Sequence, residues 1–205
     1  MVEASIKLPA PSLQGKTSVE EAISRRRSVR SFKSDLLSLL QLSQILWSAQ
    51  GITGNGRYRA VPSAGATYPL EVFIIAGEQT IESVEAGVYH YEAGGCSVKL
   101  FAKGDLRHRL AGVALNQSFI ATAPLNIVVC AIFSRTTSMY GKRGEGYVYI
   151  EVGHASQNIS LQAIALGLAT TVVGAFDDGE VRGILGVEEH ITPLYIIPVG
   201  KPVQD

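Results

Sequence analysis

The chain has 205 residues, of which 46% are hydrophobic, and this suits one large domain with a packed core. Its 18 basic residues balance 18 acidic ones, so net charge favours neither nucleic acid nor an anionic membrane as a partner. Two cysteines provide no disulfide framework, and no His or Cys cluster indicates a metal site. No apolar run is long enough to cross a bilayer, and no signal-peptide core opens the chain, so we expect a soluble, cytoplasmic protein.

The N-terminal part predicts an extended arm followed by two helices. Prolines and a glycine make residues 1–16 an arm, and Ser18 is a suitable cap for a helix over 18–27. Apolar residues recur at helical spacing over 36–50, and Gly51 is a plausible end for that helix.

The remaining chain interleaves apolar strands with helices. A glycine-rich turn at 54–56 precedes the first strand, and a second turn at 93–95 predicts a hairpin. Strands are predicted over 71–77, 87–92, 97–101, 125–133, 170–173 and 193–199. Helices are predicted over 105–119, 146–167 and 179–185. This order is typical of an α+β or mixed α/β class, and without repeats or a linker we expect one domain over 1–205.

The helix over 146–167 carries apolar residues around most of its circumference, Ile150 and Ile159 among them. Such a helix must be buried on nearly all sides. A subunit interface explains this most simply, so we expect a homodimer. A central helix within a monomeric domain is the alternative.

The most informative motif is the run Arg25–Phe32, which holds four arginines and two serines. Arginine offers forked donors that fit phosphate oxygens in pairs, and an unpaired buried charge is too costly to keep. The motif therefore predicts a phosphate-bearing ligand. A solvated basic patch or a partner-binding basic run is the alternative.

Three further features are weak alone. The block Pro62–Pro69 consists largely of small residues, which let the backbone approach a flat ligand closely. The stretch Val172–Asp178 is a strand that runs into a glycine turn, whose backbone N–H groups can face a heteroaromatic ring. Lys201 follows the last strand, where it can reach a phosphate.

Taken in order, these features resemble the nitroreductase-like family of FMN flavoproteins, in particular the branch of azoline dehydrogenases that oxidise thiazoline and oxazoline rings in peptides. The resemblance rests on RRSVRSF, PSAGATYP, GVYHYE, APLNIVVCAIF, EVGHASQNISLQAIALGL and VVGAFDD, and it covers about residues 17–203. It implies an α+β fold with a central mixed sheet flanked by helices. It also implies an intertwined homodimer with FMN at the subunit interface.

The family pattern assigns FMN contacts to named residues. The phosphate and ribityl chain would be held by Arg26, Arg27, Ser28 and Arg30, with Lys201 approaching the same phosphate. The partner subunit would place against the ring its Pro62, Ser63, Ala64 and Gly65. The other side of the ring would be lined by Val173, Gly174 and Ala175, and an amide contact falls near Gln117.

The chain also departs from the nitroreductases proper. Their PSSxNxQPW block is here PSAGATYP, and no acidic residue precedes the glycine of VVGAF. These departures disfavour a general nitroaromatic role and favour the azoline-dehydrogenase branch. That branch often works in a larger modification complex with a cyclodehydratase, although this chain is short for the group.

The resemblance thus predicts an FMN-dependent oxidoreductase that transfers hydride through flavin N5, acting as an NAD(P)H-linked reductase or as an azoline-type dehydrogenase of a small molecule or peptide. A flavin-binding or storage protein without turnover is one alternative, and a nucleotide-phosphate binder unrelated to flavin is another. No glycine fingerprint for NAD(P)H is present, so a nicotinamide donor would use the flavin pocket itself.

A few single residues also carry expectations. Candidate proton carriers are Tyr140, Lys142 and Arg143, which lie in a segment with several glycines. The alternative is that this segment is a mobile surface loop without a catalytic role. We expect His154 to be an interior histidine and Asp177 to cap the following helix.

Overall fold

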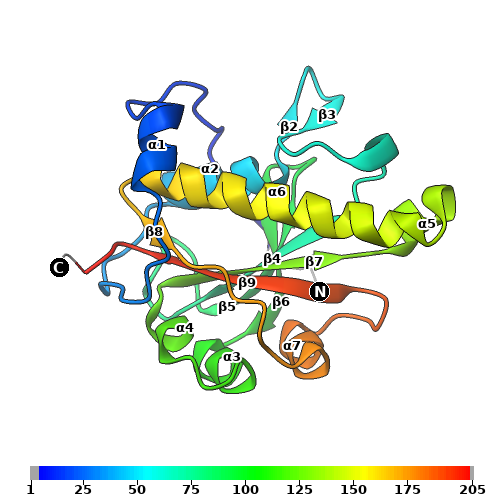
Figure 1. The fold of residues 1–205 in the computed structure, drawn as a ribbon. Helices are drawn as coiled ribbons and strands as arrows, with labels where there is room; N and C mark the ends of the chain where they lie inside the picture. Colours follow the sequence, from blue (N-terminus) through cyan, green and yellow to red (C-terminus); the bar gives the residue numbers. More distant parts are fainter. Residues whose placement is uncertain (1–4, 204–205) are drawn as a thin grey trace.

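The computed structural model describes residues 5–203 and is built on one seven-stranded sheet (Figure 1). In spatial order its strands are β1 (Ser5–Lys7), β6 (Ser97–Lys103), β5 (Gly87–Glu92), β4 (Leu70–Ala76), β7 (Leu125–Ala131), β9 (Thr192–Gly200) and β8 (Ala169–Thr170). All of their ladders are antiparallel. Parallel pairing is confined to isolated bridges such as Ser28–Thr170, so the sheet is less mixed than the resemblance implied.

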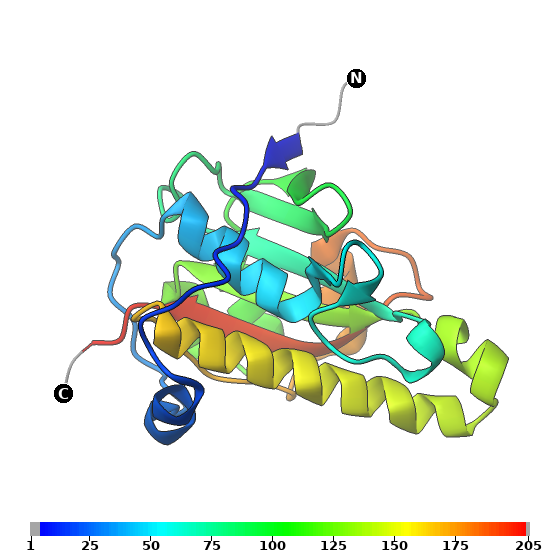
Figure 2. The same ribbon diagram turned by 90° about the horizontal axis from the view of Figure 1, so that it is seen from above.

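Helices cover both faces of this sheet (Figures 1 and 2). One face carries α2 (Leu39–Gln50) and α6 (Arg143–Ala165), and the other carries α3 (Arg107–Val113), α4 (Ser118–Thr122) and α7 (Asp178–Leu185). Alternation along the central strands supplies both cores, because successive side chains of a strand point to opposite faces. On β4, for example, Ile74 belongs to the first core and Phe73 to the second. The predicted α+β class with flanking helices is confirmed.

The N-terminal elements follow their capping residues. Helix α1 (Val19–Arg25) begins after Ser18, whose Oγ accepts the Glu21 N–H. Helix α2 begins later than residue 36 because Ser38 forms a full capping box with Gln41, and it ends at Gly51 as predicted. The described part of the arm pairs β1 with β6 and then crosses α2 on its way to α1 (Figure 2). The turn at 54–56 closes a small hairpin of β2 (Ile52–Thr53) and β3 (Tyr58–Arg59).

Two predicted elements were wrong in extent. The helix over 105–119 is broken into α3 and α4, because Leu115 and Asn116 both adopt a left-handed backbone with φ of 57°. The strand over 170–173 stops at Thr170, and Val173 forms only an isolated bridge with Ile196. The other predicted strands match β4, β5, β6, β7 and β9 within about two residues.

The segment 138–144 is not a loop. Tyr140 ends the helix α5 (Ser134–Tyr140), Gly141 turns with a φ of 56°, and Arg143 already begins α6. The three candidate proton carriers therefore stand on a tight helix–helix corner.

Helix α6 has one buried side and one exposed side. Val148, Val152 and Ile159 lie in the core over the sheet. The opposite side exposes Tyr149, Ile150, Gly153, His154 and Gln157. This chain therefore does not surround the helix on all sides, and His154 is a surface residue, which corrects the prediction of an interior one.

The same Ile→Glu substitution on the buried and on the exposed side of α6 should affect stability differently. Ile159→Glu puts an unpaired carboxylate where the side chain is fully buried, which costs several kcal/mol. Since most domains have only about 5–15 kcal/mol of stability, we expect this variant to lose most of its cooperative thermal transition. Ile150→Glu changes a side chain that is 53% exposed and should keep that transition. Circular dichroism melts compare the two, and an Ile159→Glu melt like that of the wild type would contradict the core assignment.

Candidate functional site

The arginine motif lies along the edge of the sheet. Beyond α1, the Val29 N–H donates to the Thr170 carbonyl at 3.0 Å, next to the Ser28–Thr170 bridge. The Lys33 N–H donates to the Lys201 carbonyl at 2.9 Å. Segments from the two ends of the chain thus lie side by side, with Lys201 paired to the end of the arginine motif.

The cations of this surface differ in their partners. The Arg27 guanidinium donates to the carbonyls of Ser24 and Arg26, and the Lys201 Nζ lies 3.1 Å from Asp35. Within residues 5–203, neither Arg26 nor Arg30 has a carboxylate partner; the Arg30 guanidinium instead lies over the Phe119 ring at 5.9 Å. Two arginines that lack an anion in the described chain suit an anionic ligand.

The glycine turn is next to this surface. Val173 exchanges two 2.9 Å backbone hydrogen bonds with Ile196 of β9, which leaves Gly174 and Ala175 exposed just beyond. A Cβ added to Gly174 would lie 3.3 Å from the Tyr195 ring, so the glycine keeps the backbone close to β9. The turn ends at Asp177, whose carboxylate caps α7 as expected.

Gln117 stands at the start of α4, two residues before Phe119, and its Nε2 donates to the Ala114 carbonyl at 2.8 Å. Nearby in sequence to the turn, Thr171 is buried and its Oγ1 has no hydrogen-bond partner. These features together suit a ligand with a phosphate and a ring: the arginines without a carboxylate suit the phosphate, and the exposed backbone of the glycine turn and the Thr171 hydroxyl without a partner suit the ring.

The Pro62–Gly65 turn lies elsewhere. A Cβ at Gly65 would come within 2.6 Å of the Tyr140 Oη, and Thr67 Oγ1 lies 2.8 Å from Thr136 Oγ1 of α5. This turn therefore packs at the α5 end of α6, whereas α1 and the arginine motif lie at the other end (Figure 1).

Helix α6 separates the two halves of the predicted site. Its 23 residues span about 34 Å at 1.5 Å per residue. Gly65 lies by the α5 end of this helix, whereas Ser63 contacts Glu151 and the Ala60 carbonyl accepts from Asn158 at 3.3 Å, so the chain before the turn runs along α6.

Glu151 is a functional candidate that the sequence analysis missed. It lies on the inner side of α6 with only 3% of its surface exposed. Burial raises the pKa of this carboxyl to about 7, although contacts with the Ser63 hydroxyl and the Gln50 amide oppose the rise. The Glu151 Oε1 and the Gln50 Nε2 both lack a hydrogen-bond partner. An acid placed between the apolar residues Ile150 and Val152 was the signal available in the sequence.

A polar cavity of about 200 Å³ lies on the other side of Gln50. It contains Glu71, whose carboxylate is 2.6 Å from His90 Nε2 and 2.5 Å from Arg135 Nη2. Burial raises the pKa of Glu71, but the His90 hydrogen bond and the Arg135 charge outweigh it, so that the net pKa is lowered. Unlike Glu151, this half-buried carboxylate has a partner at each oxygen.

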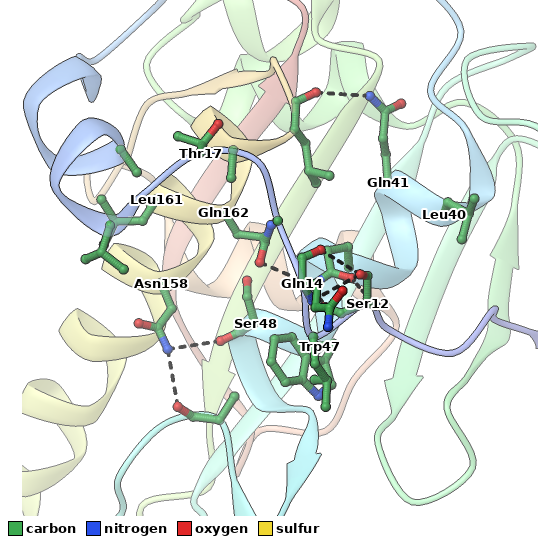
Figure 3. A pocket seen from close by; sticks show the side chains of 18 of the residues that line it. Ser12, Gln14, Thr17, Leu40, Gln41, Trp47, Ser48, Asn158, Leu161 and Gln162 are labelled. Carbon is green, nitrogen blue, oxygen red and sulfur yellow. Dashed lines mark hydrogen bonds between the residues drawn. The ribbon is translucent and has the colours of Figure 1, made fainter.

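A larger cavity of about 730 Å³ opens between the arm, α1, α2 and α6 (Figure 3). Amide side chains line it and hold the arm: Gln44 bonds both the N–H and the carbonyl of Ser12, and Asn158 bonds the Ser48 carbonyl. None of the predicted FMN-contact residues lines this cavity.

The candidate proton carriers lie near the Pro62–Gly65 turn. The Tyr140 and Tyr147 rings are 5.2 Å apart, and the Arg143 guanidinium lies 5.3 Å over Tyr147. Lys142 is exposed. Among residues 5–203, no group of three His, Cys, Asp or Glu side chains can hold a metal ion, and no helix is long and apolar enough to span a bilayer.

A family model described as Nitroreductase family matches residues 23–201, which is most of the chain. The chain belongs to the nitroreductase family. Members of this family are generally oxidoreductases and typically bind a flavin. Protein MJ1384 of Methanocaldococcus jannaschii is 44% identical over 186 residues, covering 91% of this chain and 92% of that protein. The family predicted from the sequence is confirmed.

Two further relatives process a peptide or belong to such a system. The microcin B17-processing protein McbC of Escherichia coli is 27% identical, over 78% of this chain but only 61% of McbC. The E. coli microcin synthetase McbBCD complex with truncated pro-MccB17 bound gives a TM-score of 0.78 at 26% identity, over 98% of this nitroreductase-family chain and 78% of the matched chain. Such relatives agree with the resemblance to the peptide-modifying branch.

Glu151 should cost the folded protein stability at neutral and alkaline pH. Its folded pKa of about 7 lies above the ordinary 4.5, so the folded chain holds the proton more tightly. The stability that the protonated carboxyl allows is fully present at low pH, and it is lost as the pH rises from about 4.5 through 7. At pH 8, we expect Glu151→Gln to be more stable than wild type by on the order of 2–3 kcal/mol, and at pH 5 the difference should fall below about 1 kcal/mol.

Urea unfolding at the two pH values measures this difference. Glu145→Gln, an exposed change on the same helix, is the matched control and should follow the wild type. A Glu151→Gln variant whose stability changes with pH in the same way as that of the wild type would show that the buried carboxyl does not titrate as described.

Proposed function

We propose that this nitroreductase-family protein is an FMN-dependent oxidoreductase. The observation that carries the proposal is the pair of arginines, Arg26 and Arg30, that flank Ser28 on the sheet edge without a carboxylate partner in the described chain. Bound FMN would supply hydride transfer through its N5 atom. The residues of this chain would bind and orient the cofactor: Arg26, Arg27, Ser28, Arg30 and Lys201 at the phosphate, and Val173, Gly174, Ala175 and Gln117 beside the ring.

The site is completed in a homodimer. The exposed side of α6 is a stripe at helical spacing, and Gly146 and Gly153 on it have open space where a Cβ would be. Small residues allow a second helix to approach closely. Two α6 helices packed antiparallel about a two-fold axis would bring Pro62, Ser63, Ala64 and Gly65 of one chain to the arginine motif of the other. The separation of these segments within one chain supports this arrangement.

The substrate follows from the same site. As a reductase, the protein would bind NAD(P)H and an electron acceptor in turn over one ring, because the sequence has no separate dinucleotide fingerprint. The relationship to McbC favours the dehydrogenase direction instead, in which an azoline ring of a peptide gives hydride to the flavin and an electron acceptor such as dioxygen reoxidises it. Tyr140, Lys142 and Arg143, close to the Pro62–Gly65 turn, would carry protons there. A flavin-storage protein without turnover remains the second candidate, because the phosphate surface serves either role.

Arginine substitutions test the phosphate site. Arg26→Ala removes one charge-assisted interaction worth about 1.5–3 kcal/mol, so FMN affinity should fall roughly tenfold to a hundredfold. Arg25→Ala is the matched control, because Arg25 is exposed and pairs with Glu21 at 2.7 Å. Fluorescence titration of apoprotein with FMN measures both. Unchanged affinity in Arg26→Ala would remove Arg26 from the site.

The same reconstituted protein separates turnover from storage. We expect NADH or NADPH, or an azoline-containing peptide, to bleach the bound FMN under anaerobic conditions. FMN that is bound but stays oxidised with every donor would favour the storage protein. If the protein binds no FMN at all, the proposal fails.

Mixed dimers test whether one site uses two chains. An Arg26→Ala chain and a Gly65→Val chain each lack one half of the site; at Gly65 the φ of 59° and the Tyr140 contact leave no room for a side chain. After mixing and subunit exchange, about a quarter of the sites should regain FMN binding, because half of the dimers are mixed and each has one intact site. Adding Ile150→Glu to both chains should abolish the rescue by breaking the α6 stripe. If the site were built within one chain, mixing would restore nothing.

A further inference from the structure

Glu151 places a carboxyl inside the protein directly behind the turn that we assign to the flavin ring. The carboxyl contacts Ser63, the second residue of that turn, and Gln50 at the end of α2. Ser63 in turn accepts the Tyr68 N–H at 2.9 Å, so its hydroxyl oxygen is occupied and its single proton is free to point either way. Only the Ser63 side chain thus stands between Glu151 and the proposed ligand surface.

No cation compensates this carboxyl in the described chain. Helix α2 has no charged residue at all. On the neighbouring segment, the Arg59 guanidinium donates to the Gln50 backbone carbonyl at 3.1 Å and stacks on Tyr68. Beyond Gln50, Arg135 and His90 are engaged with Glu71 in their own cavity. On α6 itself, Glu145 and His154 face solvent and Tyr147 pairs with Tyr140.

We propose that Glu151 is a positioning residue that takes up a proton when FMN settles on the 62–65 turn, so that binding at the ring end of the site is coupled to neutralisation of this carboxyl. The inference rests on the proposed function, because it requires that the turn contacts FMN. The overall change is binding of one FMN and one solvent proton, with no bond made or broken in the ligand.

Two physical effects make FMN binding favour the protonated form of Glu151. A ring laid on the turn removes the remaining water from this region, and desolvation disfavours the charged form of a carboxyl. An ionised Glu151 would also hold the Ser63 proton, whereas a neutral Glu151 leaves it for the ligand. The pKa of about 7 in the free chain means that the carboxyl is part-ionised at neutral pH. Because binding raises that pKa further, FMN affinity should fall as pH rises above 7.

Titrations of apoprotein with FMN between pH 6 and 8.5 test this coupling. The phosphate of FMN ionises near pH 6, and this affects every variant alike. The ratio of the wild-type Kd to the Glu151→Gln Kd should be near one at pH 6 and should rise to about tenfold or more at pH 8.5. Glu145→Gln should follow the wild type throughout. Calorimetry in two buffers of different ionisation enthalpy should show proton uptake on FMN binding by wild type at pH 7.5 and none by Glu151→Gln.

A second variant keeps the inference testable if Glu151→Gln folds poorly. Gln50→Leu removes a contact that lowers the Glu151 pKa without changing the turn, so the fall in FMN affinity should move to higher pH. If wild type and these variants bind FMN with the same pH dependence, the inference is wrong while the proposed function stands. If none of them binds FMN at any pH, the proposed function itself is wrong.

Discussion

The length and one-sided burial of α6 are the constraint on which the site depends. Val148, Val152 and Ile159 hold the helix against the sheet, so it is a rigid spacer of about 34 Å rather than an adjustable arm. Residues attached to its two ends are kept apart for the same reason. The arginine motif follows one end and the Pro62–Gly65 turn packs near the other, which is why we place a complete site between two chains.

The sheet edge organises the arginine half of the site. Beyond α1, the chain from Ser28 to Lys33 forms backbone hydrogen bonds with Thr170 and Lys201, so it occupies donors and acceptors that an edge strand would leave open. These contacts use only backbone atoms, so they do not engage the arginine side chains. The guanidinium groups of Arg26 and Arg30 are left without a carboxylate, and the glycine turn after Val173 lies on the adjacent backbone.

Two buried carboxyls show how the surroundings decide protonation. Glu71 and Glu151 lie on either side of Gln50, and burial raises the pKa of both. Glu71 has His90 and Arg135 as partners, and its net pKa is lowered. Glu151 has only a hydroxyl and an amide, and its pKa rises to about 7. The first carboxylate is a structural anchor for α5 and β4, whereas the second is free to exchange a proton near neutral pH.

Much of the fold was predictable because it depends on local signals. Ser18 and Gly51 marked helix ends, and nearly continuous apolar runs marked β4 and β7 as buried strands. The break at Leu115 and Asn116 was missed, because a left-handed backbone is uncommon at a leucine and neither residue is a glycine that would have marked it. The apolar residues of α6 were visible in the sequence, but its exposed stripe was not. The spacing of apolar residues does not show which side of a helix packs against the rest of the chain.

By itself, the sequence determined the family, the α+β class and the arginine motif, because the order of motifs and the local periodicity depend only on the linear order of residues. Only the tertiary structure decided that the motif and the Pro62–Gly65 turn lie at opposite ends of α6, and that Glu151 is buried behind Ser63 without a counter-charge. Both depend on which segments pack together in space. The free energy of a charge and the geometry of a split site are set by neighbours that lie far away in sequence.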